Sequence, residues 1–164
     1  MHEYKRSGGL APLLATGTLA LAGCGGGNSD ASFISKVDAV CRSAQSQIDA
    51  LGQPASSSPA ELATFFRKVL PLAQAEGAKI RAIGAPGDKA NAVAAANANH
   101  DESITLLNQA IAAADAADTS ALNLILTRVQ ALNSTADALA TRIGVTDCVS
   151  KNSGAGTTTA TTTT

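Results

Sequence analysis

Apolar residues recur at steps of three and four along most of the chain after position 30, the pattern of helices that each bury one face. The pattern is clearest in two segments. The first is stopped by Gly52, and its apolar positions are Ile34, Val37, Cys41, Ala44, Ile48 and Leu51. The second is opened by Thr119 or Ser120 and closed by Gly144, and its apolar positions are Leu122, Ile125, Val129, Leu132, Ala136, Leu139 and Ile143.

Two further helices are predicted between these segments. Ser58-Pro59-Ala60-Glu61 is a capping box with proline at the first helical position, so a helix begins there. Pro71 lacks an N–H and clashes with the preceding turn, which predicts a kink between Arg67 and Pro71. The apolar positions of this helix are Leu62, Phe66, Val69, Ala73, Ile80 and Ile83. An alanine-rich helix capped by Asp88 follows, and its more apolar face carries Val93, His100, Ile104, Leu107, Ile111 and Ala114.

The predicted fold is all-α. Helices of similar length joined by short turns favour an antiparallel up-down-up-down four-helix bundle, here with a kinked second helix. An alternative is three helices with the kinked second segment split, which changes the count and not the class. No segment alternates with period two, so a sheet is not expected. The bundle is placed at residues 31–150, and the Gly-, Ser- and Thr-rich residues 151–164 are predicted to be a disordered tail.

Charge and aromatic content narrow the range of partners. The 164 residues include 12 Lys and Arg against 13 Asp and Glu, and these are not gathered on a basic face. A nucleic-acid partner is therefore not expected. The chain has no Trp, one Tyr and three Phe, too few to build stacking platforms for bases or sugars.

The first residues have the layout of a signal peptide. Lys5 and Arg6 precede an apolar stretch from Leu10 to Ala22, and small residues follow it. The stretch is shorter than the roughly 20 apolar residues that cross a bilayer. Residues 1–23 are therefore predicted to be a cleaved leader.

Leu21-Ala22-Gly23-Cys24 resembles the lipobox of bacterial lipoproteins. The resemblance implies that the Cys24 thiol receives a diacylglyceryl group, that Cys24 becomes the first residue after cleavage, and that it carries at least two acyl chains such as palmitate. Two acyl chains give lasting attachment to a membrane, here on the extracytoplasmic face of the cell membrane. Residues 24–30 would form a flexible glycine-rich spacer. The alternative is an ordinary secretory signal in which Cys24 is incidental.

Two cysteines remain after Cys24, and an even number in an oxidising compartment predicts a disulfide between Cys41 and Cys148. A redox or metal-binding pair is the weaker reading, because no Cys-x-x-Cys motif occurs. The exported part also resembles, in outline, small actinobacterial lipoproteins of unassigned role. The likeness rests on a Phe-Ile-x-x-x-Asp-x-x-Cys opening at Phe33 to Cys41 and on a Leu-x-x-x-x-Gly-x-x-x-Cys close at Leu139 to Cys148. It implies a helical fold and no activity.

His100 directly precedes Asp101 and Glu102, which makes these residues the first candidates for a metal site or an acid/base pair. Neighbouring residues on a helix point in different directions, so these three side chains are not expected to share a cage. No Glu-x-x-His pair, haem motif, phosphate loop or Gly-x-Ser-x-Gly turn occurs. We therefore predict no metal, no cofactor and no enzymatic activity, with His100 solvated or partly packed.

Three carboxylates lie within or near the apolar positions, Asp38, Asp49 and Glu76. They are the acids most prone to an unusual environment, although exposure at the edge of the apolar face is the commoner outcome and the one expected here. Asn133-Ser134-Thr135 matches a glycosylation acceptor by coincidence, since it falls inside a predicted helix.

Two functional hypotheses follow. The first is a non-catalytic binding or scaffolding module of the cell envelope that meets an envelope protein partner. The second is a small-ligand carrier or sensor, because Pro71, Gly77 and the alanine-rich third helix would leave a cavity between helices.

Overall fold

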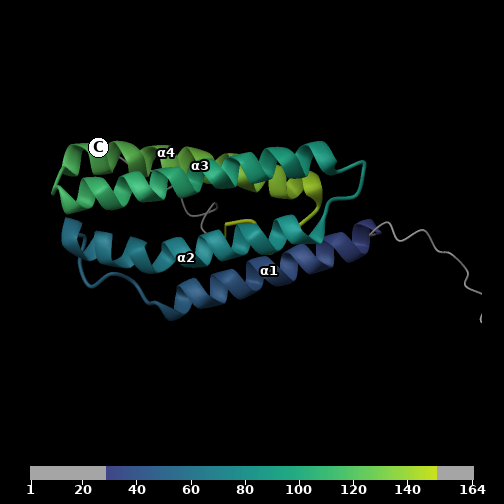
Figure 1. Ribbon diagram of the computed structural model, residues 1–164, viewed down its shortest axis with the longest axis horizontal. Coiled ribbons are helices and arrows are strands. Elements are labelled where there is room, and N and C mark those ends of the chain that lie inside the picture. Colours follow the sequence, from purple (N-terminus) through teal and green to yellow (C-terminus); the bar gives the residue numbers. More distant parts are fainter. Residues whose placement is uncertain (1–28, 151–164) are drawn as a thin grey trace, which may run out of the picture.

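The computed structural model describes residues 29–150, which form four helices and no strand. The helices are α1 (Asp30–Ala50), α2 (Pro59–Ile83), α3 (Ala90–Asp115) and α4 (Thr119–Ile143). Figure 1 shows α1 beside α2 and α3 beside α4, the two pairs lying one on the other. The predicted all-α class is confirmed. The leader with Cys24, most of the spacer and the Thr-rich tail lie outside the described residues.

Consecutive helices pack against each other, whereas α1 and α4 barely touch. α2 runs through Pro71 as one helix, so the alternative of three helices with a split second segment is not observed. None of the helices between residues 29 and 150 is long and apolar enough to pass through a membrane.

Local sequence signals account for several helix ends. The Ser58 hydroxyl accepts the N–H of Glu61 at the start of α2, as the capping box predicts. Gly144 ends α4 with φ of 93°, a left-handed backbone conformation that glycine adopts without a steric penalty.

Two helix starts differ from the prediction. Asp118 caps α4 in place of Thr119 or Ser120, and Lys89 precedes α3 in place of Asp88 without making a side-chain capping bond. Each observed capping residue lies one or two positions from the predicted one. Neighbouring polar residues compete for the same capping role, and only the path of the turn selects one of them.

Buried apolar side chains form two separate clusters. One lies at the end of the bundle where α3 begins, and it comprises Phe33, Val37, Cys41, Ala92, Val93, Ala140, Ile143 and Val145. The other lies where α3 ends, and it comprises Ala63, Ala110, Ala113, Ala114 and Leu122. The core is therefore interrupted along the length of the bundle.

The buried face of α3 is wider than predicted. Leu106 and Ala110 are 1% and 0% exposed, although neither belongs to the predicted apolar face of this helix. α3 packs against both α2 and α4. It therefore buries two faces, whereas the sequence pattern predicted the burial of one.

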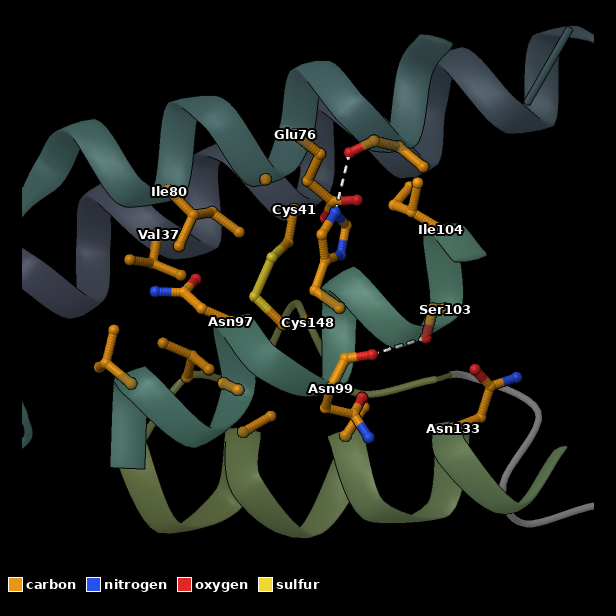
Figure 2. A pocket seen from close by; sticks show the side chains of 18 of the residues that line it. Val37, Cys41, Glu76, Ile80, Asn97, Asn99, Ser103, Ile104, Asn133 and Cys148 are labelled. Carbon is orange, nitrogen blue, oxygen red and sulfur yellow. Dashed lines mark hydrogen bonds between the residues drawn. A yellow bond between two sulfur atoms is a disulfide. The ribbon is translucent and has the colours of Figure 1, made fainter. Parts of the chain in front are cut away.

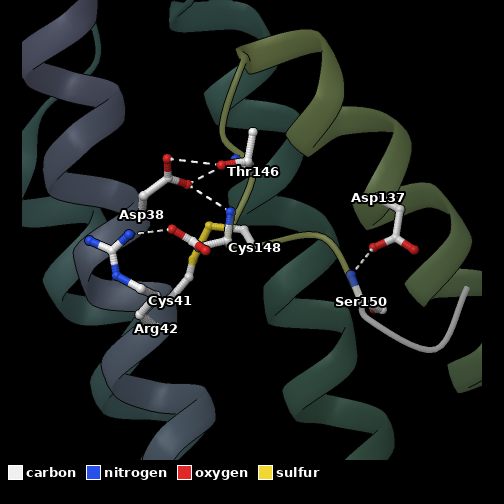
Figure 3. The surroundings of a disulfide bond; sticks show 8 residues. Asp38, Cys41, Arg42, Asp137, Thr146, Cys148 and Ser150 are labelled. Atoms are coloured by element: carbon white, nitrogen blue, oxygen red, sulfur yellow. Dashed lines mark hydrogen bonds and ion pairs between the residues drawn. A yellow bond between two sulfur atoms is a disulfide. The ribbon is translucent and has the colours of Figure 1, made fainter.

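The segment after α4, residues 145–150, crosses to α1 and is held there by a disulfide between Cys41 and Cys148 (Figure 3). The predicted pairing is thus confirmed in the structure. At the far end of the segment, the Ser150 N–H donates to the Asp137 carboxylate of α4 at 2.8 Å. The segment joins two helices that hardly contact each other directly.

Asp38 lies under this segment, and its predicted exposure is wrong. Its side chain is 9% exposed. One of its carboxylate oxygens accepts the backbone N–H of Thr146 at 2.8 Å (Figure 3) and that of Asp147 at 2.9 Å. Beside it, Arg42 and Asp147 form an ion pair at 2.5 Å. The donors come from more than 100 positions away in the sequence, so no local pattern indicates that Asp38 is buried.

Candidate functional site

A cavity of about 380 Å³ lies against the first apolar cluster, most of whose residues are part of its wall, whereas no residue of the second cluster lines it. On α3 the wall extends from Val93, a member of the first cluster, to Leu107, which lies three residues before Ala110 of the second cluster. Figure 2 shows side chains from several helices converging on this space. All four helices and the segment after α4 contribute to its wall, which comprises Phe33, Val37, Cys41, Val69, Ala73, Glu76, Gly77, Ile80, Val93, Ala96, Asn97, Asn99, His100, Ser103, Ile104, Leu107, Val129, Asn133, Ala136, Ala140, Ile143, Val145 and Cys148.

Small side chains are the reason that the space is open. Ala73 and Gly77 on α2, Ala96 on α3 and Ala136 on α4 stand where larger apolar residues would fill the core. Alanine and glycine bury little area, and four helices held at fixed spacing cannot close around them. The wall is mainly aliphatic, and Phe33 is its one aromatic residue.

Several polar groups of the wall already have partners within the protein. The Ser103 hydroxyl donates to the Asn99 carbonyl at 3.0 Å (Figure 2), and the Asn99 side-chain amide donates to the Leu132 carbonyl at 3.4 Å. The first bond lies within α3, and the second joins α3 to α4. Asn133, from the sequence that matches a glycosylation acceptor, lies on the helix α4 at the exposed edge of the cavity.

His100 is half-buried against α2. Its Nε2 lies 3.0 Å from the backbone carbonyl oxygen of Ala73. A carbonyl only accepts, so Nε2 carries the hydrogen and donates it, which leaves Nδ1 as an acceptor in the neutral ring. Burial lowers the pKa of His100 below its usual 6.5, and the charge of Arg81 lowers it further against the opposing effects of the Ala73 bond and Asp101. His100 is therefore neutral at neutral pH.

Gly77 is what allows the imidazole to lie so close to α2. A Cβ at this position would lie 2.6 Å from Nε2 and 2.7 Å from Cδ2 of His100. Glycine costs about 1 kcal/mol relative to alanine in a helix interior. Here it permits the ring to reach the Ala73 carbonyl.

The neighbours of His100 point elsewhere, as predicted. Asp101 forms an ion pair with Arg81 of α2, while Glu102 pairs with Arg128 of α4 at 3.2 Å. Among residues 29–150, no three His, Cys, Asp or Glu side chains are grouped so that they would hold a metal ion.

Glu76 extends from α2 toward the cavity (Figure 2). Burial raises the pKa of its carboxyl from 4.5 to about 7, because the apolar wall disfavours the charged form. Glu76 is half-buried, so the expectation that it is exposed at the edge of the helix is wrong. Asp49, by contrast, is exposed as predicted and accepts a hydrogen bond from Gln45 at 2.7 Å.

The sequence singled out Glu76 and His100 of this site but did not place them together. Glu76 and His100 are 24 positions apart by number and share a wall only because α2 and α3 pack side by side. Asn97 and Ser103 carried no signal beyond their place in an alanine-rich helix.

Comparison with protein-family models, curated proteins and solved structures gives no match for this chain.

Proposed function

We propose that this chain is a lipid-anchored protein of the extracytoplasmic face of the cell membrane, and that its helical domain is a non-catalytic binding module. The anchor is Cys24, in the residues 21–24 that resemble a lipobox. A thiol is the nucleophile that this attachment needs. Gly25-Gly26-Gly27 then separates the folded domain from the membrane surface.

In the proposed domain, we expect the directions of the helices to follow from the short connections between them. Four helices of 21 to 26 residues with short connections prefer to alternate in direction, up-down-up-down. Pro71 inside α2 is the expected place for a kink.

The cavity favours a small ligand as the molecule that the module binds. Its volume of about 380 Å³ lies within the roughly 300 to 1,000 Å³ of typical ligand pockets, and it has their mainly apolar wall with a few polar groups. Leu124 is the only large hydrophobic side chain that is exposed in the described part of the chain. A broad apolar patch typical of a protein interface is thus missing from that surface. Docking of an envelope protein remains the alternative.

The anchor is tested by a Cys24→Ala variant in cells fed an alkyne analogue of palmitate. We expect the wild-type protein to be labelled and to sediment with membranes, and the variant to lose both properties because no thiol remains to be acylated. Gly25→Ala, one position further, is the matched control and should keep both. Unlabelled wild-type protein in the culture medium would instead support an ordinary secretory signal.

Small-ligand binding is tested by native mass spectrometry of the protein purified from its own cells. We expect a bound small molecule that disappears in Ala136→Leu, because the added side chain occupies the cavity. Filling it should also raise the free energy of unfolding by about 1 to 2 kcal/mol. Ala138→Leu, at an exposed position of the same helix, should keep the ligand. Finding each of the three proteins at the mass of its own polypeptide, with no bound molecule, would count against carriage.

A further inference from the structure

Glu76 is the one acidic side chain among the residues that line the cavity. In the described part of the chain its carboxylate has neither a hydrogen-bond nor an ion-pair partner, whereas Asp101, Glu102 and Asp115 each pair with an arginine. A carboxylate withdrawn from water without a partner is costly to bury. A ligand that supplies the missing positive charge would remove that cost.

We propose that the cavity binds a small amphiphile with a protonated primary or secondary amine at one end, which pairs with Glu76, and with an aliphatic body that fills the apolar remainder. The proposal rests on the small-ligand function argued above and names the class of ligand. At the packing density of protein interiors, the cavity would hold roughly fifteen non-hydrogen atoms.

Two polar groups of the wall, Glu76 and His100, favour an N–H donor. His100 uses its Nε2–H on the Ala73 carbonyl, so the nitrogen that it has left, Nδ1, accepts hydrogen bonds. The ionised Glu76 carboxylate also only accepts. An ammonium group with two or three N–H bonds matches two acceptors, whereas a carboxylate ligand would meet repulsion and no donor from either residue.

Within residues 29–150, no lysine or arginine lines the cavity to supply the positive charge. The arginine whose charge acts on His100 is Arg81, and it is paired with Asp101 on an exposed part of the surface. Lys79, also on α2, is exposed and is not among the residues that line the cavity.

The walls also indicate which cations are excluded. Quaternary ammonium ions are recognised by cages of several aromatic rings, and here Phe33 is the single aromatic residue. Such ions also have no N–H bond to donate to Glu76 or His100. Aliphatic side chains and alanine form most of the surface that would contact the body of the ligand.

The test uses four probes that share an eight-carbon chain: octylamine, octanol, octanoate and octyltrimethylammonium. Binding to the full exported protein is measured by isothermal titration calorimetry at pH 8. We expect octylamine to bind at least ten-fold more tightly than octanol, and the other two more weakly still. In Glu76→Gln the advantage of octylamine over octanol should vanish while octanol binds as before. Glu61→Gln, on an exposed turn of the same helix, should leave the wild-type order unchanged.

Octanol that binds as tightly as octylamine to the wild-type protein would overturn the amine assignment, as would an octylamine affinity that Glu76→Gln leaves intact. Octylamine binding that survives Ala136→Leu would place the amine outside the cavity and would overturn it as well. Failure of the amine assignment can be distinguished from failure of the proposed small-ligand function. If only the amine assignment is wrong, a copurified ligand of another chemical class still appears by native mass spectrometry.

Discussion

Replacing both Cys41 and Cys148 with alanine should lower the free energy of unfolding by about 4 to 5 kcal/mol. The disulfide closes a loop with a sequence separation of 107, and a cross-link over a loop of that length removes about this much conformational freedom from the unfolded chain. The domain also depends on it locally, since the segment 145–150 connects α1 to α4 where the helices themselves barely touch.

The measurement is urea unfolding followed by circular dichroism. Wild-type protein treated with a thiol reductant should unfold at nearly the same urea concentration as the double-alanine variant, because both lack the cross-link. Changing both residues avoids an unpaired thiol that would form intermolecular disulfides. A loss below about 1 kcal/mol would mean that the hydrogen bonds to Asp38 hold the segment without the cross-link.

Replacing Glu76 with glutamine should stabilise the protein at pH 8 by about 2 to 3 kcal/mol and leave its stability at pH 4.5 nearly unchanged. The pKa of Glu76 is raised to about 7 in the folded protein from 4.5, so the folded state holds this proton more tightly than the unfolded state does. The contribution of Glu76 is therefore fully present below pH 4.5 and is lost as the pH rises through 7. A neutral glutamine carries no such penalty.

His100 lines the same cavity and contributes in the opposite direction. Because burial lowers its pKa, its contribution is present above pH 6.5 and is lost as the pH falls through its lowered value. Unfolding curves at pH 4.5, 6, 7 and 8 for wild type and Glu76→Gln should be compared pairwise, so that the His100 contribution cancels. Glu61→Gln, at an exposed position, should differ from wild type by the same amount at every pH. A difference for Glu76→Gln that is equally flat would show that this carboxyl is not withdrawn from water.

Signals that act over a few residues were predictable from the sequence. The capping box at Ser58 and the glycine at position 144 each fix a helix end through atoms at most a turn away. The apolar periodicity identified four helices for the same reason. The pairing of Cys41 with Cys148 was predictable by a different route, because only two cysteines remain once Cys24 is assigned to lipid.

The burial of Asp38 and Glu76 was decided by the tertiary structure. Asp38 is buried because two N–H groups of the segment after α4 reach it across the bundle. Glu76 faces a cavity that exists only where small residues from three helices meet. Helix formation depends on near neighbours in the chain. The environment of a side chain depends on which distant segments pack around it, and a one-dimensional pattern does not contain that information.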